Sequence, residues 1–189
     1  RGRAQVIIRG MLFDVDDTLV DTRTAFAAAV SAVAERFLPH VRADRHADLV
    51  AAWRRDDGGY FRAYTRGELD FRGQRHARAN HLHLAFGGRP LDRPAFDVWT
   101  AIFEEALGGA WRAHHDAAAA VADIGARGLA IGALSNSEVS YQERKLARSG
   151  LGHVRLLVGL DTLGVGKPDP RVFHEACRRL GTEPAETVY

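Results

Sequence analysis

Cysteine, lysine and long apolar runs are scarce in this sequence, and each shortage excludes a class of protein. The single cysteine, Cys177, excludes a disulfide within the chain and favours a reducing compartment, so we expect a cytoplasmic protein. No apolar run approaches the roughly 20 residues of a membrane-spanning helix, so no membrane partner is expected. Lys145 and Lys167 are the only lysines among 26 basic residues. The net charge is only +2, and no basic cluster carries interleaved aromatic residues, which argues against nucleic-acid binding.

Strand and helix patterns alternate along most of the 189 residues. The apolar run V-I-I-R-G-M-L-F over Val6–Phe13 predicts a strand buried on both faces, as in a parallel sheet. Further strands are expected at Leu129–Leu134, at Val154–Val158 and from Thr187 to Tyr189. Predicted helices occupy residues 25–38, 116–126, 138–149 and 171–180. This order predicts an α/β fold with a Rossmann-like parallel sheet.

A helical insertion interrupts this alternation. Residues 41–107 have helical patterning broken by glycines, and no convincing strand alternation. We therefore expect residues 1–21 and 114–189 to form the α/β core and residues 22–113 a helical domain. Its aromatic residues are interpreted as core packing, with substrate contact as the second interpretation: Trp53, Tyr60, Phe61, Tyr64, Trp99 and Phe103. Three of its arginines are candidates for binding an anionic substrate: Arg62, Arg72 and Arg75.

Polar residues follow three of the predicted strands. Asp14-Val15-Asp16-Asp17-Thr18-Leu19 follows the first, and Ser135-Asn136 follows the second. A loop from Gly159 to Pro170 is predicted after the third, and it carries Gly166-Lys167-Pro168-Asp169-Pro170. In an open parallel sheet, ligands bind beyond the carboxyl ends of the strands. These three segments therefore predict one site at one edge of the sheet.

The residue types at these strand ends suit the hydrolysis of a phosphate monoester. An aspartate can divide this slow reaction into two steps by forming an aspartyl-phosphate. Its carboxylate is repelled by phosphate with about 4 kcal/mol per charge pair at 4 Å, so cations such as Mg²⁺ and Lys167 must offset the repulsion. Asp16 can exchange protons with the leaving group and with water. The Ser135 hydroxyl and the backbone N–H groups that open the next helix suit phosphoryl oxygens.

These segments resemble the motifs of the haloacid dehalogenase superfamily. M-L-F-D-V-D-D-T-L-V-D-T is similar to its first motif, L-S-N-S to its second and G-K-P-D-P to its third. The stretch Y-Q-E-R-K-L-A-R-S-G-L, Tyr141–Leu151, resembles the subgroup that contains small-metabolite phosphatases and nucleotidases. The resemblance covers Val6–Asp21 and Asp116–Tyr189, and it reaches the helical insertion only by position and helical character.

The resemblance implies a role for each motif residue and a Mg²⁺ cofactor. Asp14 would be the nucleophile and a metal ligand, and Asp16 the acid/base and a metal ligand through its backbone carbonyl. Lys167 would stabilise the nucleophile and the transferring group, and three residues would bind substrate: Thr18, Ser135 and Asn136. The insertion would be a helical cap that closes over the site and selects the substrate.

The family's fourth motif, an acidic pair that completes the Mg²⁺ shell, normally follows the strand that begins at Thr187. We therefore expect the natural protein to continue past Tyr189, with fourth and fifth strands, the fourth of which normally flanks strand one. A true end at Tyr189 would leave strand one as an unprotected edge and would predict poor metal affinity and weak activity.

Residues of these motifs, and the histidines of the chain, also allow other interpretations. A D-x-D-x-T segment alone is also typical of a surface turn. A calcium loop is excluded because its sixth and twelfth positions would be Leu19 and Ala25, and a nucleotide P-loop because Pro168 follows Lys167. Ser135 as a simple helix cap stays open. A zinc site is disfavoured because its candidate ligands do not share a helix face and no fitting cysteine lies nearby: His81, His83, His114 and His115.

The function predicted first is hydrolysis of a small phosphorylated metabolite, a sugar phosphate or a nucleotide. Haloacid dehalogenases resemble this chain but typically lack the second aspartate, because halide leaves without a proton, so Asp16 favours phosphate. Two more functions stay open on the same scaffold, a phosphomutase and an inactive binding protein. The sequence makes no prediction of substrate identity or oligomeric state.

Overall fold

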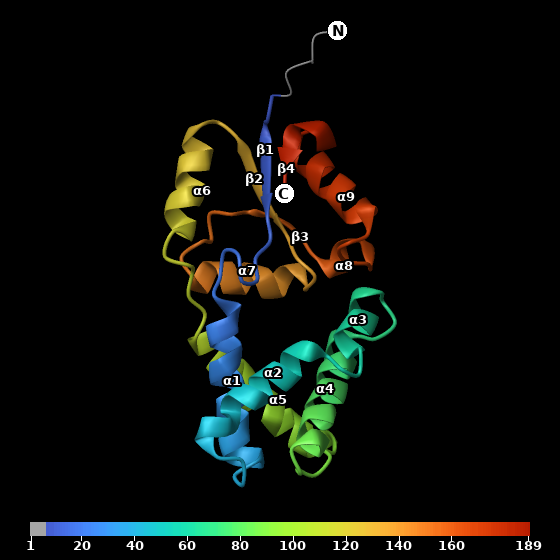
Figure 1. The fold of residues 1–189 in the computed structure, drawn as a ribbon. Coiled ribbons are helices and arrows are strands. Elements are labelled where there is room, and N and C mark those ends of the chain that lie inside the picture. Colours follow the sequence, from blue (N-terminus) through green and yellow to red (C-terminus); the bar gives the residue numbers. More distant parts are fainter. Residues whose placement is uncertain (1–6) are drawn as a thin grey trace. The chain divides into compact units, whose positions relative to one another are not determined.

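The computed structural model describes residues 7–189, and the chain divides into two compact units. The first is an α/β unit that runs to Asp21 and resumes at Arg112, and the second is the helical unit Thr22–Trp111 (Figure 1). The α/β unit includes Arg112 and Ala113, two residues more than the predicted division. The reason is local pairing, since the Asp21 N–H donates to the Arg112 carbonyl at 2.9 Å and Val20 bridges to Ala113.

A four-stranded parallel sheet forms the centre of the α/β unit, which confirms the predicted fold class. Its strands are β1 (Gly10–Phe13), β2 (Ala130–Leu134), β3 (Leu156–Val158) and β4 (Thr187–Val188), in the order β3-β2-β1-β4. All three pairings are parallel. The strand that precedes Asp14 therefore lies between two others, and its carboxyl end shares an edge with that of β2.

Strand β1 is shorter than predicted. The predicted start, Val6, lies outside the described residues, and Ile7 and Ile8 precede the strand and are 70% and 39% exposed. Pairing begins only at Gly10, because β2 starts at Ala130 and β4 at Thr187, opposite Gly10 on either side. The expectation that strand one would be an edge is wrong for its first half, where β4 pairs with it.

Within residues 7–189, the α/β unit contains four α-helices: α6 (Ala117–Ala126), α7 (Val139–Arg148), α8 (Leu160–Leu163) and α9 (Pro170–Leu180). Figure 1 shows α6 and α9 on opposite sides of the sheet. Helix α9 packs on β2 and β3, and its buried residues join strand residues in one apolar cluster: Leu12, Leu134, Val158, Val172, Ala176 and Cys177. Helix α8 lies in the segment after β3 that was predicted to be a loop.

The helical unit consists of α1 (Thr22–Phe37), a short 3₁₀ helix (Ala43–Arg45), α2 (His46–Arg55), α3 (Tyr60–Thr65), α4 (Phe71–Ala85) and α5 (Arg93–Gly109). Helices α1 and α5 make its most extensive contact. Aromatic rings fill its interior, and the Trp99 and Phe103 rings stack with centroids 4.8 Å apart. Core packing is confirmed for four of the six predicted aromatic residues, which are buried: Trp53, Tyr64, Trp99 and Phe103. No helix among residues 7–189 is long and apolar enough to cross a membrane.

Candidate active site

Asp14 is the first residue after β1, at the carboxyl end of the sheet. Its Oδ1 accepts a hydrogen bond from the Val15 N–H at 2.8 Å and lies 2.8 Å from Lys167 Nζ. The side chain is 37% exposed, so one face of the carboxylate remains open to solvent. An ionised carboxylate of this kind is held in place and available as a nucleophile.

A tight turn follows Asp14 and brings the chain back beside it. Asp17 adopts a left-handed conformation (φ 57°), which aspartate tolerates better than most residues. The Asp17 N–H donates to the Val20 carbonyl at 2.9 Å, and the Val20 N–H donates to the Val15 carbonyl at 3.0 Å. Val15 and Val20 are fully buried and anchor this turn to the core.

Lys167 comes to Asp14 from the loop after β3 and α8. An ammonium group has three donors, and here they have three acceptors: Asp14 Oδ1, the Leu134 carbonyl at 3.0 Å and the Tyr189 hydroxyl at 2.6 Å. The lysine backbone is fixed as well. Its N–H donates to Asn136 Oδ1 at 2.6 Å, and Asn136 Nδ2 donates to its carbonyl at 2.9 Å. Asn136, predicted to bind phosphate, therefore holds the lysine loop in this structure.

A second cluster forms around Asp16, and we call it the Asp16 cluster: Asp16, Ser135, Gln142 and Lys145. Gln142 Nε2 donates both to Asp16 Oδ2 and to Ser135 Oγ, each at 2.7 Å. Lys145 Nζ forms an ion pair with Asp16 Oδ1. Ser135, Gln142 and Lys145 are buried. Both aspartates of the D-x-D motif thus have a lysine partner.

The start of α7 differs from the sequence-based expectation. The helix begins at Val139 with Glu138 as its N-cap, so the interpretation of Ser135 as the helix cap is wrong. The Val139 N–H donates to Asp161 Oδ1 at 3.0 Å, and this first N–H of the helix is therefore already bonded to a carboxylate of α8. Three residues, Asn136 to Glu138, separate Ser135 from the first residue of the helix, so Ser135 lies too far back to cap it.

The structure brings five of the six predicted site residues into two groups: Asp14, Asn136 and Lys167 contact one another in a chain, whereas Asp16 and Ser135 are linked through Gln142. Thr18 is the exception: it is exposed in the turn, and its hydroxyl makes no hydrogen bond to any residue in the range 7–189. Gln142, Lys145 and Tyr189 were missed. The sequence did carry a signal for Gln142 and Lys145, because two polar residues three apart on a predicted helix share one face of it.

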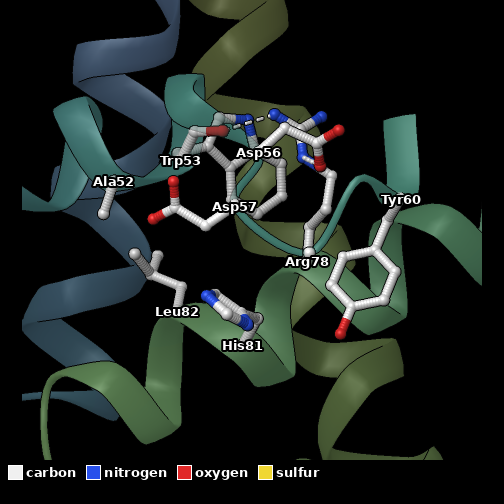
Figure 2. Close-up of a pocket in the computed structure, with 9 residues that line it drawn as sticks. Ala52, Trp53, Asp56, Asp57, Tyr60, Arg78, His81 and Leu82 are labelled. Carbon is white, nitrogen blue, oxygen red and sulfur yellow. Dashed lines mark hydrogen bonds and ion pairs between the residues drawn. The ribbon is translucent and has the colours of Figure 1, made fainter. Parts of the chain in front are cut away.

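Another polar cluster lies in the helical unit, at the turn between α2 and α3. Figure 2 shows Arg78 of α4 reaching this turn beside Trp53 and Asp56. The guanidinium lies 4.2 Å from the Trp53 ring centre, donates to the Trp53 carbonyl at 2.7 Å and pairs with Asp56 at 3.7 Å. Burial lowers the pKa of Arg78 to about 10. The adjoining cavity measures about 10 Å³, room for one water, so this cluster stabilises a turn and is too small for a substrate.

The arginines proposed for anion binding are mostly engaged inside the helical unit. Arg75 is buried, forms an ion pair with Glu104 and lies over the Phe103 ring. Arg72 forms an ion pair with Asp97. Arg62 is exposed on α3. Arg75 therefore belongs to the core of this unit.

Comparisons with known proteins agree with this geometry. The family model of haloacid dehalogenase-like hydrolases matches residues 8–189. Phosphoserine phosphatase from Thermus thermophilus is 32% identical over 94% of this chain and 78% of its own length. Glyceraldehyde 3-phosphate phosphatase from Methanopyrus kandleri is 27% identical over 97% of this chain and 75% of its own length.

A solved structure shares the fold. L-2-haloacid dehalogenase from Xanthobacter autotrophicus superposes with a TM-score of 0.74 at 20% identity, and the match covers 96% of this chain and 68% of that one. The match to the family model spans the β1 turn, the Asp16 cluster and the Lys167 loop. The chain therefore belongs to the haloacid dehalogenase-like hydrolases and is an enzyme of that family.

Proposed function

We propose that this enzyme is a phosphatase that hydrolyses a small phosphorylated metabolite through an aspartyl-phosphate on Asp14. The observation that carries the proposal is the 2.8 Å contact between Asp14 Oδ1 and Lys167 Nζ at the carboxyl end of a parallel sheet. A second carboxylate, Asp16, stands two residues further on. Nucleophile, positive charge and proton carrier are thus present in one unit of the chain.

In the first step, an Asp14 carboxylate oxygen attacks phosphorus. The bond from phosphorus to the ester oxygen breaks, its electron pair goes to that oxygen, and Asp16 supplies the proton that makes it an alcohol. The Lys167 ammonium offsets the repulsion between the Asp14 carboxylate and the phosphoryl oxygens. The Ser135 hydroxyl, which accepts from Gln142, keeps its own hydrogen for a phosphoryl oxygen.

In the second step, water attacks phosphorus of the aspartyl-phosphate and gives a proton to Asp16. The bond from phosphorus to Asp14 breaks, and the carboxylate is restored as inorganic phosphate leaves. The net reaction consumes one monoester and one water and produces one alcohol and one phosphate. Asp16 returns to its starting protonation state, as a catalyst must.

The donor atoms of the site are of the type that Mg²⁺ prefers. The Asp14 carboxylate and the Asp16 backbone carbonyl are both oxygen donors, and Mg²⁺ is often held by one or two carboxylates together with substrate phosphate and water. Among the described residues, no group of three or more histidine, cysteine, aspartate or glutamate side chains gathers as a further candidate. Bound at Asp14, Mg²⁺ would supply positive charge to the phosphoryl oxygens.

Asp16 and the relatives favour a phosphate ester over an organic halide. A halide leaves without a proton, whereas an alkoxide needs one, and Asp16, held by Gln142 and Lys145, is the group proposed to supply it. The two curated relatives are named for phosphoserine and glyceraldehyde 3-phosphate, both small monoesters. We infer a substrate of that class, a sugar phosphate or a nucleotide, met in the cytoplasm. We also propose that the helical unit acts as the cap that selects it.

A phosphate-release screen tests this proposal. Purified enzyme with Mg²⁺ is offered sugar phosphates, nucleotides and phosphoserine, and the best substrate is repeated with EDTA and with Asp14→Asn. We expect release with Mg²⁺ alone, and a phosphoryl adduct on Asp14 in acid-quenched protein by mass spectrometry. Asp17→Asn is the matched control, because it removes a neighbouring carboxylate and asparagine tolerates the left-handed conformation. Equal release by Asp14→Asn would refute the proposal.

A further inference from the structure

Two side chains of α7 contact the carboxylate of Asp16 directly. Gln142 Nε2 donates to Asp16 Oδ2 at 2.7 Å, and Lys145 Nζ pairs with Asp16 Oδ1. The two residues are three apart and therefore share one face of the helix. Each oxygen of the carboxylate thus has its own partner from the same rigid element.

The burial of these partners differs from that of the carboxylate. Gln142 is fully buried and the Lys145 side chain is 4% exposed, whereas the Asp16 side chain is 39% exposed. A buried ammonium is costly unless it is paired and hydrogen-bonded, so its place beneath Asp16 is a specific arrangement. The carboxylate is bound on its inner side and open to solvent on its outer side.

The residue type at position 145 also indicates a specific contact with Asp16. Lys145 and Lys167 are the only lysines of the chain, and each pairs with one aspartate of the D-x-D motif. An ammonium is a compact point charge, whereas a guanidinium is a planar fork that engages both oxygens of a carboxylate together. A lysine at position 145 leaves Asp16 Oδ2 to Gln142.

This arrangement leaves acceptor sites for a proton. An ionised carboxylate offers about four lone-pair sites on its two oxygens. Lys145 and Gln142 each use one, and the Asp16 side chain is still 39% exposed. Proton transfer needs a group that is both fixed in position and accessible to the reacting atom.

We propose that Gln142 and Lys145 are positioning residues that hold the Asp16 carboxylate in the orientation required to protonate the leaving group. This inference rests on the proposed phosphatase activity. Gln142 also donates to Ser135 Oγ at 2.7 Å, so it links the position of the acid to that of a hydroxyl proposed to bind phosphate. Lys145 pairs with the Asp16 carboxylate itself.

Substrates with different leaving groups separate a positioning role from a structural one. An alkyl phosphate loses an alkoxide that needs the Asp16 proton, whereas dinitrophenolate leaves 2,4-dinitrophenyl phosphate without one. The ratio kcat/KM covers the steps up to the aspartyl-phosphate. We expect Lys145→Met to lower kcat/KM at least about tenfold for the alkyl phosphate and less than about threefold for the dinitrophenyl ester, because general acid catalysis contributes about 10²–10⁴-fold. Arg148→Met, which removes an exposed charge from the same helix, should match wild type on both.

Two further variants keep the test decisive if Lys145→Met does not fold, which thermal unfolding will reveal. Lys145→Arg retains the charge and should recover part of the lost activity on the alkyl phosphate. Gln142→Leu should lower kcat/KM for both esters, because Ser135 loses its partner, and should lower it further for the alkyl phosphate, because Asp16 loses one too.

Two kinds of failure are distinguishable. Equal losses on both esters, or none on either, overturn the positioning role while wild-type phosphate release still supports a phosphatase. Wild-type enzyme that releases no phosphate, or release that survives in Asp14→Asn, overturns the proposed function itself and the positioning role with it.

Discussion

Replacement of Lys167 by methionine tests the central electrostatic argument. The substitution keeps most of the length of the unbranched side chain and removes the charge that lies 2.8 Å from Asp14 Oδ1. At an effective dielectric constant near 20, that separation corresponds to an attraction of about 6 kcal/mol, against a repulsion of about 4 kcal/mol for each carboxylate–phosphate charge pair at 4 Å. Solvent and metal would offset part of the loss.

A realistic loss is therefore that of one preorganised donor, about 2.7–4 kcal/mol, or about 100- to 1,000-fold in kcat/KM. Continuous phosphate release with the best substrate measures it, and thermal unfolding checks that the variant is folded. Lys167→Arg should also stay well below wild type, because a planar fork does not match the three acceptors around the ammonium. Arg179→Met, an exposed position on α9, is the charge control. A Lys167→Met enzyme within about threefold of wild type would refute the reasoning.

Two predictions concern the stability of the helical unit, measured by urea unfolding. Asp56→Asn leaves the buried Arg78 guanidinium without its counter-ion and should cost about 3 kcal/mol, while the exposed Asp57→Asn should change little; equal effects would contradict a role for the buried pair. Burial lowers the pKa of His83, so the unfolded chain binds more protons below the ordinary value of 6.5. Stability should therefore fall as the pH drops below about 6.5, by at most about 1.4 kcal/mol per pH unit from this group, and His83→Gln should remove that part of the slope. An unchanged slope would mean that folding does not lower the pKa of His83.

The core of the site could be predicted because strand ends in a parallel sheet meet at one edge. Asp14, Ser135 and Lys167 each follow a strand or its connecting loop, and β1 and β2 are neighbours, so their convergence follows from topology. The sequence alone could not reveal how Asn136 is used. Its amide bonds to the Lys167 backbone across 31 positions of sequence, and such a pairing depends on how two loops pack.

The errors have a common physical cause, which is that partners far away in sequence decide local structure. Ile7 and Ile8 have the apolar character of a buried strand, but the neighbouring strands begin opposite Gly10. The first N–H of α7 is bonded by Asp161, a residue of a helix in a segment that was expected to be a loop. The sequence indicates that Gln142 and Lys145 share a helix face, but it does not indicate that both bind Asp16.

The turn after Asp14 and the segment after the helical unit are bonded to each other. The His114 N–H donates to the Leu19 carbonyl at 3.0 Å, and the Asp21 N–H donates to the Arg112 carbonyl at 2.9 Å. The two points at which the chain leaves and re-enters the α/β unit are therefore adjacent, as at the base of a long hairpin. An insert of a different length or sequence can start and finish at the same two points without altering the strands. The helical unit can thus be exchanged at this junction, in evolution or by protein engineering, while the strand ends that carry Asp14 and Ser135 stay the same.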